Sequence, residues 1–309
     1  MGYMDKFTDY ITIKKGLERS CRLIEANQEK LNNLNYFPVA DKDTGTNMAI
    51  STRRALEYME NHLSGNTPKA VLGCYCDGLL EYGRGNSGTI LTMFCDGFNA
   101  GIPDTDVITG GDLARALHHA AENACLAVDV VKEGTMLTVA RDAAKAGLSV
   151  AEMTDDPIVV WSRICEEARA ALEATKVRNP NLRDIGVVDS GAYGLCLVLD
   201  GLFSILNPDA EPPCYDFVDT CPIVKEGDTC LHYTYCTEYL VAKKDGASAA
   251  ALADLCRPLG DCLLCVENAG RIKLHIHTNS PAKIAELASG FGTIISEKMD
   301  DMSNGRVLE

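Results

Sequence analysis

Eight segments of helical period follow one another through the first two thirds of the chain, and this succession constrains the fold more than any other feature. In the first segment the positions spaced three to four apart are Leu17, Cys21, Ile24, Gln28 and Leu31. Four of these five are apolar, which is typical of one buried helix face. Pro38 ends the segment because the residue before a proline is pushed out of the helical region. Seven further helices are predicted at about 46–63, 67–81, 87–99, 111–130, 135–147, 156–176 and 190–206. The sequence therefore predicts an all-α first domain over residues 1–206.

After residue 206 the hydrophobic period changes from that of helices to that of strands. "CLHYTYCTEYLVAKK" alternates, "SAAALADLCRPLG" is helical, "DCLLCVEN" and "RIKLHIHT" alternate, "SPAKIAELASG" is helical and "GTIISEKM" alternates. This β-α-β-β-α-β order is that of a split βαβ unit. We predict a multidomain chain in which a linker at 207–226 precedes a smaller α+β domain at 227–309.

Composition restricts the classes of function. The chain has 309 residues, 46% of them hydrophobic and 24% charged, with a net charge of -15, so a broad attraction to nucleic acid or anionic lipid is not expected. No apolar run is long enough for a membrane span, and the N-terminus lacks a signal pattern, so a cytoplasmic protein is predicted. The 14 cysteines are scattered among apolar helical positions, which indicates buried thiols rather than a disulfide framework.

Four linkers of the helical domain contain glycine. "DKDTGTN", "YGRGNSGT", "VKEGTM" and "GVVDSGAYG" precede the second, fourth, sixth and eighth helices. In an up-and-down bundle all four lie at the same end, and loops gathered at one end of a rigid scaffold commonly bind ligands.

The first of these linkers has the parts of a metal-phosphate site. Asp41 and Asp43 offer the hard oxygen ligands that Mg²⁺ takes beside phosphate. The residues Thr44, Gly45, Thr46 and Asn47 open a helix, whose first N–H groups favour an anion. The alternative is a solvated turn, since aspartate, glycine and threonine are common turn residues.

The second glycine linker, "GRGNSG", gives backbone that a ligand can approach closely at Gly85 and Gly88. Asn86 and Ser87 add hydrogen-bond donors at the start of the next helix. An ordinary helix cap is the competing interpretation.

The strand "KLHIHT" places His275 and His277 on one face of a sheet, because side chains alternate along a strand. In a split βαβ unit the first and third strands are neighbours, so Cys236 could meet both imidazoles and form a set suited to Zn²⁺. His232 is a candidate fourth ligand. Cys262 and Cys265 have the spacing of a zinc or redox pair, but residues three apart on a strand face opposite sides, so both are left in the core. The alternative is a polar strand face without a metal.

Several of these segments together resemble a known family. They are "NYFPVADKDTGTNM", "GRGNSGTIL", "EGTMLTVARDAAKAG" and "NPNLRDIGVVDSGAYGL", followed by "YCTEYLVAKK" and "RIKLHIHTNSPAKIAELASGFG". The first four are similar to the DhaL-like kinase domain in the A subunit of bacterial fatty acid kinase, which is related to the ATP-binding domain of dihydroxyacetone kinase. The last two are similar to the middle domain of that subunit.

The resemblance implies an eight-helix antiparallel barrel that binds ATP and Mg²⁺ at one end. It further implies transfer of the γ-phosphoryl group to the carboxylate of a fatty acid that a separate fatty-acid-binding protein presents. A homodimer is a further expectation, and the Cys and His positions of the second domain are expected to bind zinc.

The resemblance also assigns residues. Asp41 and Asp43 would bind Mg²⁺, with Asn35 near a third metal position, and Arg84 would offset γ-phosphate charge. The nucleotide and its phosphates would be bound by Thr44, Gly45, Thr46, Asn47, Gly85, Asn86, Ser87 and Gly88, with Thr135 and Asp189 at the rim. The sequence departs from the family pattern at Lys42, Tyr82 and Val131, where small residues, glycine and proline are usual.

The sequence leaves two other functions open. The kinase could transfer phosphate to dihydroxyacetone or another small acceptor, or the chain could be a non-catalytic nucleotide- and metal-binding regulatory module. The kinase subunits that the sequence resembles continue into a third domain beyond the length of this sequence.

Overall fold

The computed structural model describes residues 10–36, 42–105, 108–128, 130–209, 213, 215, 232–302 and 306–308. The chain divides into two compact units, Met1–Leu126 with Val130–Ile223, and Val224–Glu309 with Ala127–Asp129. The predicted linker at 207–226 lies mostly outside the described residues, so its bounds stay a prediction.

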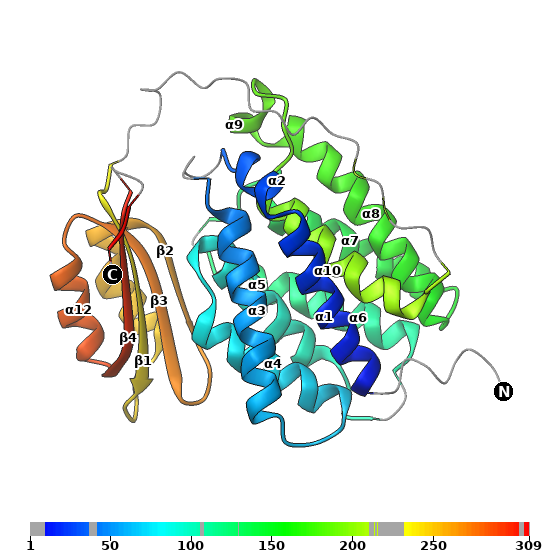
Figure 1. Cartoon of the computed structure of the whole chain (residues 1–309), viewed down its shortest axis with the longest axis horizontal. Helices are drawn as coiled ribbons and strands as arrows, with labels where there is room; N and C mark the ends of the chain where they lie inside the picture. The colour runs from blue at the N-terminus through cyan, green and yellow to red at the C-terminus, as the bar shows by residue number, and fades with distance from the viewer. Residues whose placement is uncertain are drawn as a thin grey trace. The chain divides into compact units, whose positions relative to one another are not determined.

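The first unit is helical, as predicted. Its helices are α1 (Tyr10–Ala26), α2 (Gln28–Asn33), α3 (Thr44–His62), α4 (Pro68–Tyr82), α5 (Gly85–Gly101), α6 (Gly110–Leu126), α7 (Met136–Ala151), α8 (Pro157–Arg178), α9 (Pro180–Arg183) and α10 (Ser190–Leu206). Eight of them are long, whereas α2 and α9 are short. Each long helix packs against the next one along the chain, and α10 returns to α1 (Figure 1). The eight long helices therefore form a closed ring.

Trp161 on α8 ties three of these helices together. Its fully buried ring meets Phe98 of α5 edge to face, with 5.9 Å between the ring centroids. Its indole N–H donates to the Leu199 carbonyl of α10 at 3.1 Å, so the polar atom of the ring is satisfied inside the core.

The first predicted helix is wrong in one respect, because it breaks at Asn27 into α1 and α2. The Asn27 side chain donates to the Leu23 carbonyl at 2.8 Å, and its Oδ1 accepts from the Tyr193 hydroxyl at 2.7 Å. Asparagine side chains compete in this way with helical hydrogen bonding. Gln28, which the periodicity placed on the helix face, instead begins α2 and donates to Thr46 Oγ1 at 3.2 Å.

Gly45 allows α3 to approach α2 closely. A Cβ at this position would lie 2.2 Å from the Gln28 carbonyl oxygen and 2.8 Å from Asn32 Oδ1. The nearest obstacle is backbone, which cannot rotate away, so only glycine fits without movement of one helix.

We expect Gly45→Ala to destabilise the protein by about 1–3 kcal/mol, because the added methyl group overpacks the α2–α3 contact. Gly73, inside α4, is the matched control, since its Cβ would meet only Asn99 Nδ2 at 3.4 Å. Gly73→Ala should be neutral or stabilising by up to about 1 kcal/mol. Urea unfolding followed by circular dichroism measures both, and equal effects of the two substitutions would contradict the assigned packing.

The second unit is an antiparallel sheet with helices on one face. Its elements are β1 (Tyr235–Lys243), α11 (Ala249–Cys256), a 3₁₀ turn (Arg257–Leu259), β2 (Gly260–Glu267), β3 (Arg271–Thr278), α12 (Pro281–Ser289), β4 (Gly292–Asp301) and β5 (Arg306–Leu308). The strand order is β2-β3-β1-β4-β5. The predicted β-α-β-β-α-β order and the pairing of the first and third strands are confirmed, whereas β5 was not predicted.

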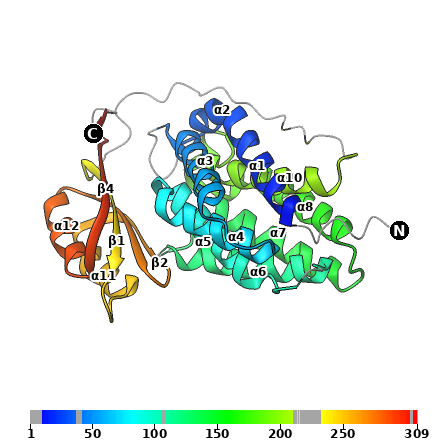
Figure 2. The same cartoon turned by 60° about the horizontal axis from the view of Figure 1, so that its bottom comes forward.

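The helices α11 and α12 cover one face of this sheet (Figure 2). The core between them includes Val241, Leu252, Ile272, Leu274, Ile276 and Ile284. Because side chains alternate along β3, His275 and His277 lie on the opposite face from Leu274 and Ile276. The helix-covered face is thus apolar, and the histidines belong to the other face.

None of the helices in the described ranges combines the length and hydropathy that a membrane span requires.

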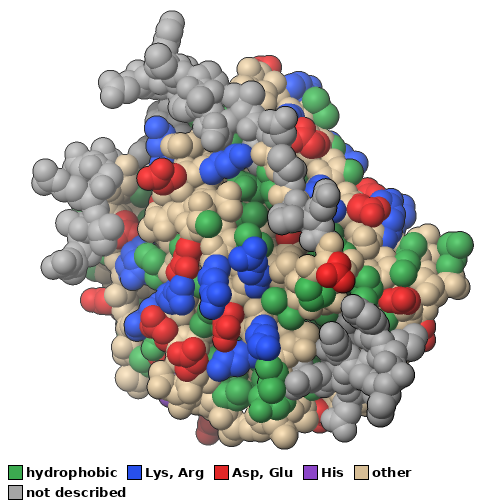
Figure 3. All heavy atoms as spheres, turned by 45° about the vertical axis from the view of Figure 1, so that its right-hand side comes forward, with side chains coloured by type: hydrophobic (Ala, Val, Ile, Leu, Met, Phe, Trp, Pro, Cys, Tyr) green, Lys and Arg blue, Asp and Glu red, His purple; other side chains and the backbone are tan. Residues whose placement is uncertain are grey.

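Figure 3 shows one face of the molecule, where Lys and Arg side chains lie among Asp and Glu side chains. Three of the ion pairs in the helical unit are Arg22–Glu18, Arg53–Glu25 and Arg54–Glu57. The basic side chains on this face are therefore interspersed with acidic ones, unlike the basic surface of a nucleic-acid-binding protein.

Candidate functional site

The starts of α3 and α5, which carry the first two glycine linkers, are in contact. The backbone N–H of Arg84 donates to Ser51 Oγ of α3 at 2.9 Å. Gly85 has φ +62, and a Cβ there would lie 2.5 Å from Asn47 Nδ2. Only glycine combines this left-handed backbone with so close an approach. Because α5 begins at Gly85, the predicted nucleotide residues 85–88 form its first turn.

The other two glycine linkers meet at the same end. The Asp189 carboxylate accepts hydrogen bonds from the backbone N–H groups of Ala192, at 2.8 Å, and of Met136, so it joins the starts of α10 and α7. Ser190 Oγ donates to the Leu31 carbonyl of α2 at 2.6 Å. Since α2 also contacts the start of α3, all four linkers are connected by hydrogen bonds or close packing. The short helices α2 and α9 lie at this end of the unit (top of Figure 1).

Two asparagine side chains already occupy the first N–H groups of α3. Asn35 Oδ1 accepts from the N–H groups of Thr44, at 2.8 Å, and Asp43, at 3.3 Å. Asn32 Oδ1 accepts from the N–H of Thr46 at 3.0 Å. A phosphate at the start of α3 would have to displace these caps, and Asn35, expected near a metal, uses its oxygen to cap the helix.

The start of α5 is the second candidate phosphate position. Its N-cap residue, Arg84, makes no side-chain hydrogen bond of its own to the first turn. Asn86 and Ser87 are partly exposed, whereas Gly85 and Gly88 are buried. The first N–H groups of a helix favour an anion, so the start of α5 is a second candidate for a phosphate. Among the described residues, the Arg84 guanidinium has no ion-pair partner.

Asp43 immediately precedes α3, and its side chain makes no capping hydrogen bond. Asp41, the other predicted Mg²⁺ ligand, lies outside the described residues. Lys42 between them has φ +58, a left-handed conformation that costs a non-glycine residue about 1–2 kcal/mol.

Thr135 precedes α7 and is partly exposed. Its hydroxyl donates to the Lys132 carbonyl at 2.8 Å, and the adjacent N–H of Gly134 donates to Thr138 Oγ1 at 2.9 Å. Gly134 packs against Asn179 before α9. Thr135 thus lies at the linker end of the barrel, and its predicted place at the nucleotide rim stays a prediction.

Burial raises the pKa of Asp189 to about 6, although the N–H groups of Ala192 and Met136 favour the ionised form. The folded protein therefore binds this proton more tightly than the unfolded chain does. The contribution of Asp189 to the free energy of unfolding is therefore highest below about pH 4. It falls as the pH rises to about 6 and is constant above that pH.

We expect Asp189→Asn to remove this pH dependence, because the amide oxygen still accepts the two N–H bonds but carries no charge. At pH 7.5 the variant should match or exceed the parent in stability, by up to about 3 kcal/mol. Urea midpoints between pH 4 and 7.5 measure the slope, with Asp156→Asn, a partly exposed N-cap of α8, as control. An unchanged slope in Asp189→Asn would assign the pH dependence to other groups.

The predicted metal ligands of the second unit do come together. The β1–β3 register places Cys236 opposite His277 and Glu238 opposite His275. Ligand atoms of Cys236, His275 and His277 all lie within 4.8 Å of one another. Burial, with the neighbouring His275, lowers the pKa of His277 to about 3, so its ring is neutral and able to bind a metal. His275 Nε2 is buried and has no hydrogen-bond partner among the described residues, which leaves this nitrogen available to a metal ion.

Of the sequence predictions for Cys265, Cys262 and His232, only that for Cys265 is correct. Cys265 packs toward the core as predicted, but Cys262 has φ +50 at a β-bulge between Asp261 and Leu264. The bulge places ligand atoms of Asp261, Cys262 and His277 within 4.8 Å of one another. His232 is exposed and precedes the first strand, so it does not share the strand face with Cys236.

Comparison with known proteins assigns the family. The family model of the DAK2 domain matches residues 38–204, which is more than half of the chain. The chain belongs to the DAK2 family. A second family model, the middle domain of proteins like the A subunit of fatty acid kinase, matches residues 232–306. The DAK2 match covers most of the helical ring, and the middle-domain match covers the sheet.

Curated relatives are longer than this chain. An uncharacterized protein of Staphylococcus saprophyticus is 34% identical over 287 residues, covering 88% of this chain and 51% of its own length. Protein YloV of Bacillus subtilis is 33% identical over 296 residues, with 90% and 53% covered. This DAK2 protein thus spans about half the length of the curated relatives it matches. Among solved structures, the dihydroxyacetone kinase of C. freundii has a TM-score of 0.46 at 17% identity, covering 62% of this chain and 34% of that chain.

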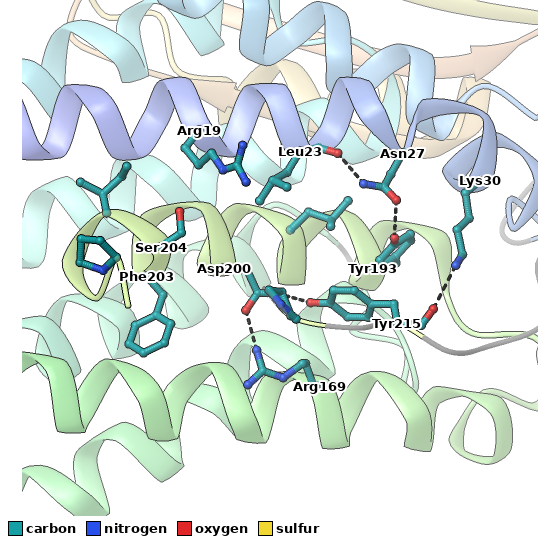
Figure 4. A pocket seen from close by; sticks show the side chains of 14 residues that line it. Arg19, Leu23, Asn27, Lys30, Arg169, Tyr193, Asp200, Phe203, Ser204 and Tyr215 are labelled. Carbon is teal, nitrogen blue, oxygen red and sulfur yellow. Dashed lines mark hydrogen bonds and ion pairs between the residues drawn. The ribbon is translucent and has the colours of Figure 1, made fainter. Parts of the chain in front are cut away.

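A groove of about 540 Å³ on the DAK2 domain was missed by sequence reasoning (Figure 4). It lies between α1, α8 and α10, and it contains buried Asp200, which accepts from Arg169 Nη1 at 2.6 Å and from the Tyr215 hydroxyl. Burial raises the pKa of Asp200. The one sequence signal was a lone carboxylate in the apolar segment "YGLCLVLDGLFSIL". None of the predicted nucleotide residues lines this groove.

Proposed function

We propose that this DAK2 protein is an ATP- and Mg²⁺-dependent kinase subunit that phosphorylates the carboxylate of a fatty acid presented by a separate fatty-acid-binding protein. One observation carries the proposal: a DAK2 domain and a middle domain like that of the fatty acid kinase A subunit occur in one chain. DAK2 domains bind ATP and Mg²⁺, and the second match favours a fatty acid as the acceptor.

The linker end of the barrel has residues that fit this role. Asp43, with its carboxylate not used for capping, would bind Mg²⁺ together with Asp41. Bound Mg²⁺ neutralises charge on the phosphate oxygens. The first N–H groups of α5 would receive a phosphate, and Arg84 would offset charge on the transferred group.

The reaction needs no proton transfer by the enzyme. An ionised carboxylate oxygen forms the new bond to the γ-phosphorus, the bond from that phosphorus to the bridging oxygen breaks, and ADP leaves with the electron pair. The products are an acyl phosphate and ADP. Positioning and charge neutralisation therefore dominate catalysis, and no general base is assigned.

We also propose that Cys236, His275 and His277 bind Zn²⁺ in the sheet unit. A thiolate and two imidazoles are typical zinc ligands. The neutral ring of His277 supports a metal there, as does His275 Nε2, which has no hydrogen-bond partner among the residues that the structure describes.

The test is to incubate the protein with Mg-ATP and a fatty-acid-loaded binding protein and to trap the acyl phosphate with hydroxylamine. Hydroxamate that requires both ATP and the loaded protein is the expected result. Turnover with dihydroxyacetone and none with the fatty acid would show that the phosphoryl acceptor is dihydroxyacetone and not a fatty acid. Mg-dependent ATP binding without transfer to either acceptor would favour a non-catalytic module.

A further inference from the structure

Each histidine of the proposed zinc site has a carboxylate beside the same ring nitrogen. His275 Nδ1 lies 3.1 Å from Glu238 Oε1, and His277 Nδ1 lies 3.5 Å from Asp261 Oδ1. The two contacts come from different strands, Glu238 from β1 and Asp261 from β2. The same arrangement therefore occurs twice around one cluster.

The Glu238 contact is fixed by strand register. Glu238 and His275 are directly opposite in the β1–β3 pair, and both side chains are buried. The 3.1 Å contact between Glu238 Oε1 and His275 Nδ1 is within hydrogen-bond distance. Glu238 is therefore placed to accept from the imidazole N–H of His275.

The Asp261 contact depends on the bulge in β2. The β2–β3 register breaks between Asp261 and Leu264, so that Asp261 is opposite His277 and Leu264 is opposite His275. Cys262 within the bulge has φ +50, which costs a non-glycine residue about 1–2 kcal/mol. Backbone strain of this kind is commonly kept at functional sites, and here it accompanies the placement of Asp261 beside His277.

The Glu238 contact leaves Nε2 of His275 for another partner. His275 Nδ1 is 3.9 Å from Cys236 Sγ but closer to Glu238, and His275 Nε2 is the nitrogen without a hydrogen-bond partner in the described part of the chain. A histidine that binds a metal through one nitrogen commonly donates its other N–H to a carboxylate, which fixes the tautomer and the ring orientation.

We propose that Glu238 and Asp261 are positioning residues that hold Nδ1–H of His275 and His277, so that both rings offer Nε2 to a zinc ion shared with Cys236. This inference rests on the zinc site proposed above. The two carboxylates are not ligands themselves. They raise zinc affinity because the rings are already oriented and in the correct tautomer before the metal binds.

The first experiment measures zinc affinity of the whole chain by competition with a chromophoric chelator. Glu238→Gln and Asp261→Asn should each weaken zinc binding by roughly 10- to 100-fold. Glu267→Gln is the matched control, since this carboxylate lies on the same sheet but pairs with Lys243. Wild-type affinity in both test variants would overturn the inference. Absence of zinc binding by the parent protein would overturn the zinc site, whatever the outcome of the acyl phosphate assay.

The second experiment distinguishes positioning from a general structural role. Nitrogen-15 NMR of the histidine rings in the zinc-loaded protein should show Nδ1–H and metal-bound Nε2 for both His275 and His277. In Asp261→Asn the spectrum of His277 should change while that of His275 is retained. Metal bound to Nδ1 of either ring would overturn the proposal. Because Asp261 is exposed, Asp261→Asn should leave the folded core intact, so the variant tests the position of the ring.

Discussion

Asp43→Asn is expected to weaken Mg-dependent nucleotide binding by roughly 100-fold or more, or about 3 kcal/mol. The Asp43 carboxylate makes no capping hydrogen bond to α3, so its loss should not unfold the helix. An amide has the same shape but no charge, and Mg²⁺ binds carboxylate oxygens preferentially. Titration with ATP in the presence and absence of Mg²⁺ measures the effect directly.

The control for this substitution is Asp104→Asn. Asp104 is exposed and follows the C-terminal end of α5, at the opposite end of that helix from Gly85. This variant should bind Mg-ATP like the parent protein. If Asp43→Asn also retained the parent affinity while its helical circular dichroism was unchanged, Asp43 would not be a metal ligand.

The helices and strands could be predicted because their signals are local. Apolar spacing of three to four predicted the long helices, whereas their closure into a barrel was implied by the family resemblance. The alternation in "RIKLHIHT" predicted β3 with both histidines on one face. The neighbouring position of β1 and β3 followed from the order of elements. These features depend on residues close together in the sequence and on well-known rules of connection.

The caps and the bulge could not be predicted, because their partners are distant in sequence or depend on exact register. The N–H groups of α3 are occupied by Asn32 and Asn35, which the periodicity alone placed in the last turn of a preceding helix. The position of Cys262 near His277 depends on the β-bulge, which the sequence does not reveal, and the sequence analysis therefore left Cys262 in the core.

Cys236→Ser is expected to abolish stoichiometric zinc binding. The serine hydroxyl has nearly the size of the thiol but is not ionised at neutral pH, and two histidines alone bind zinc weakly in comparison with a set that includes a thiolate. Elemental analysis after dialysis should fall from about one zinc per chain to near zero, a loss of more than roughly 10²-fold in affinity.

Cys265→Ser is the matched control for Cys236→Ser, because it makes the same chemical change in the same sheet. Cys265 is opposite Leu274 and packs toward the helix-covered face, so its substitution should lower stability slightly through burial of a hydroxyl while zinc is retained. Zinc retained in Cys236→Ser and lost in Cys265→Ser would place the metal on the other side of the sheet. Zinc lost only from Cys236→Ser would place it on the face that carries His275 and His277.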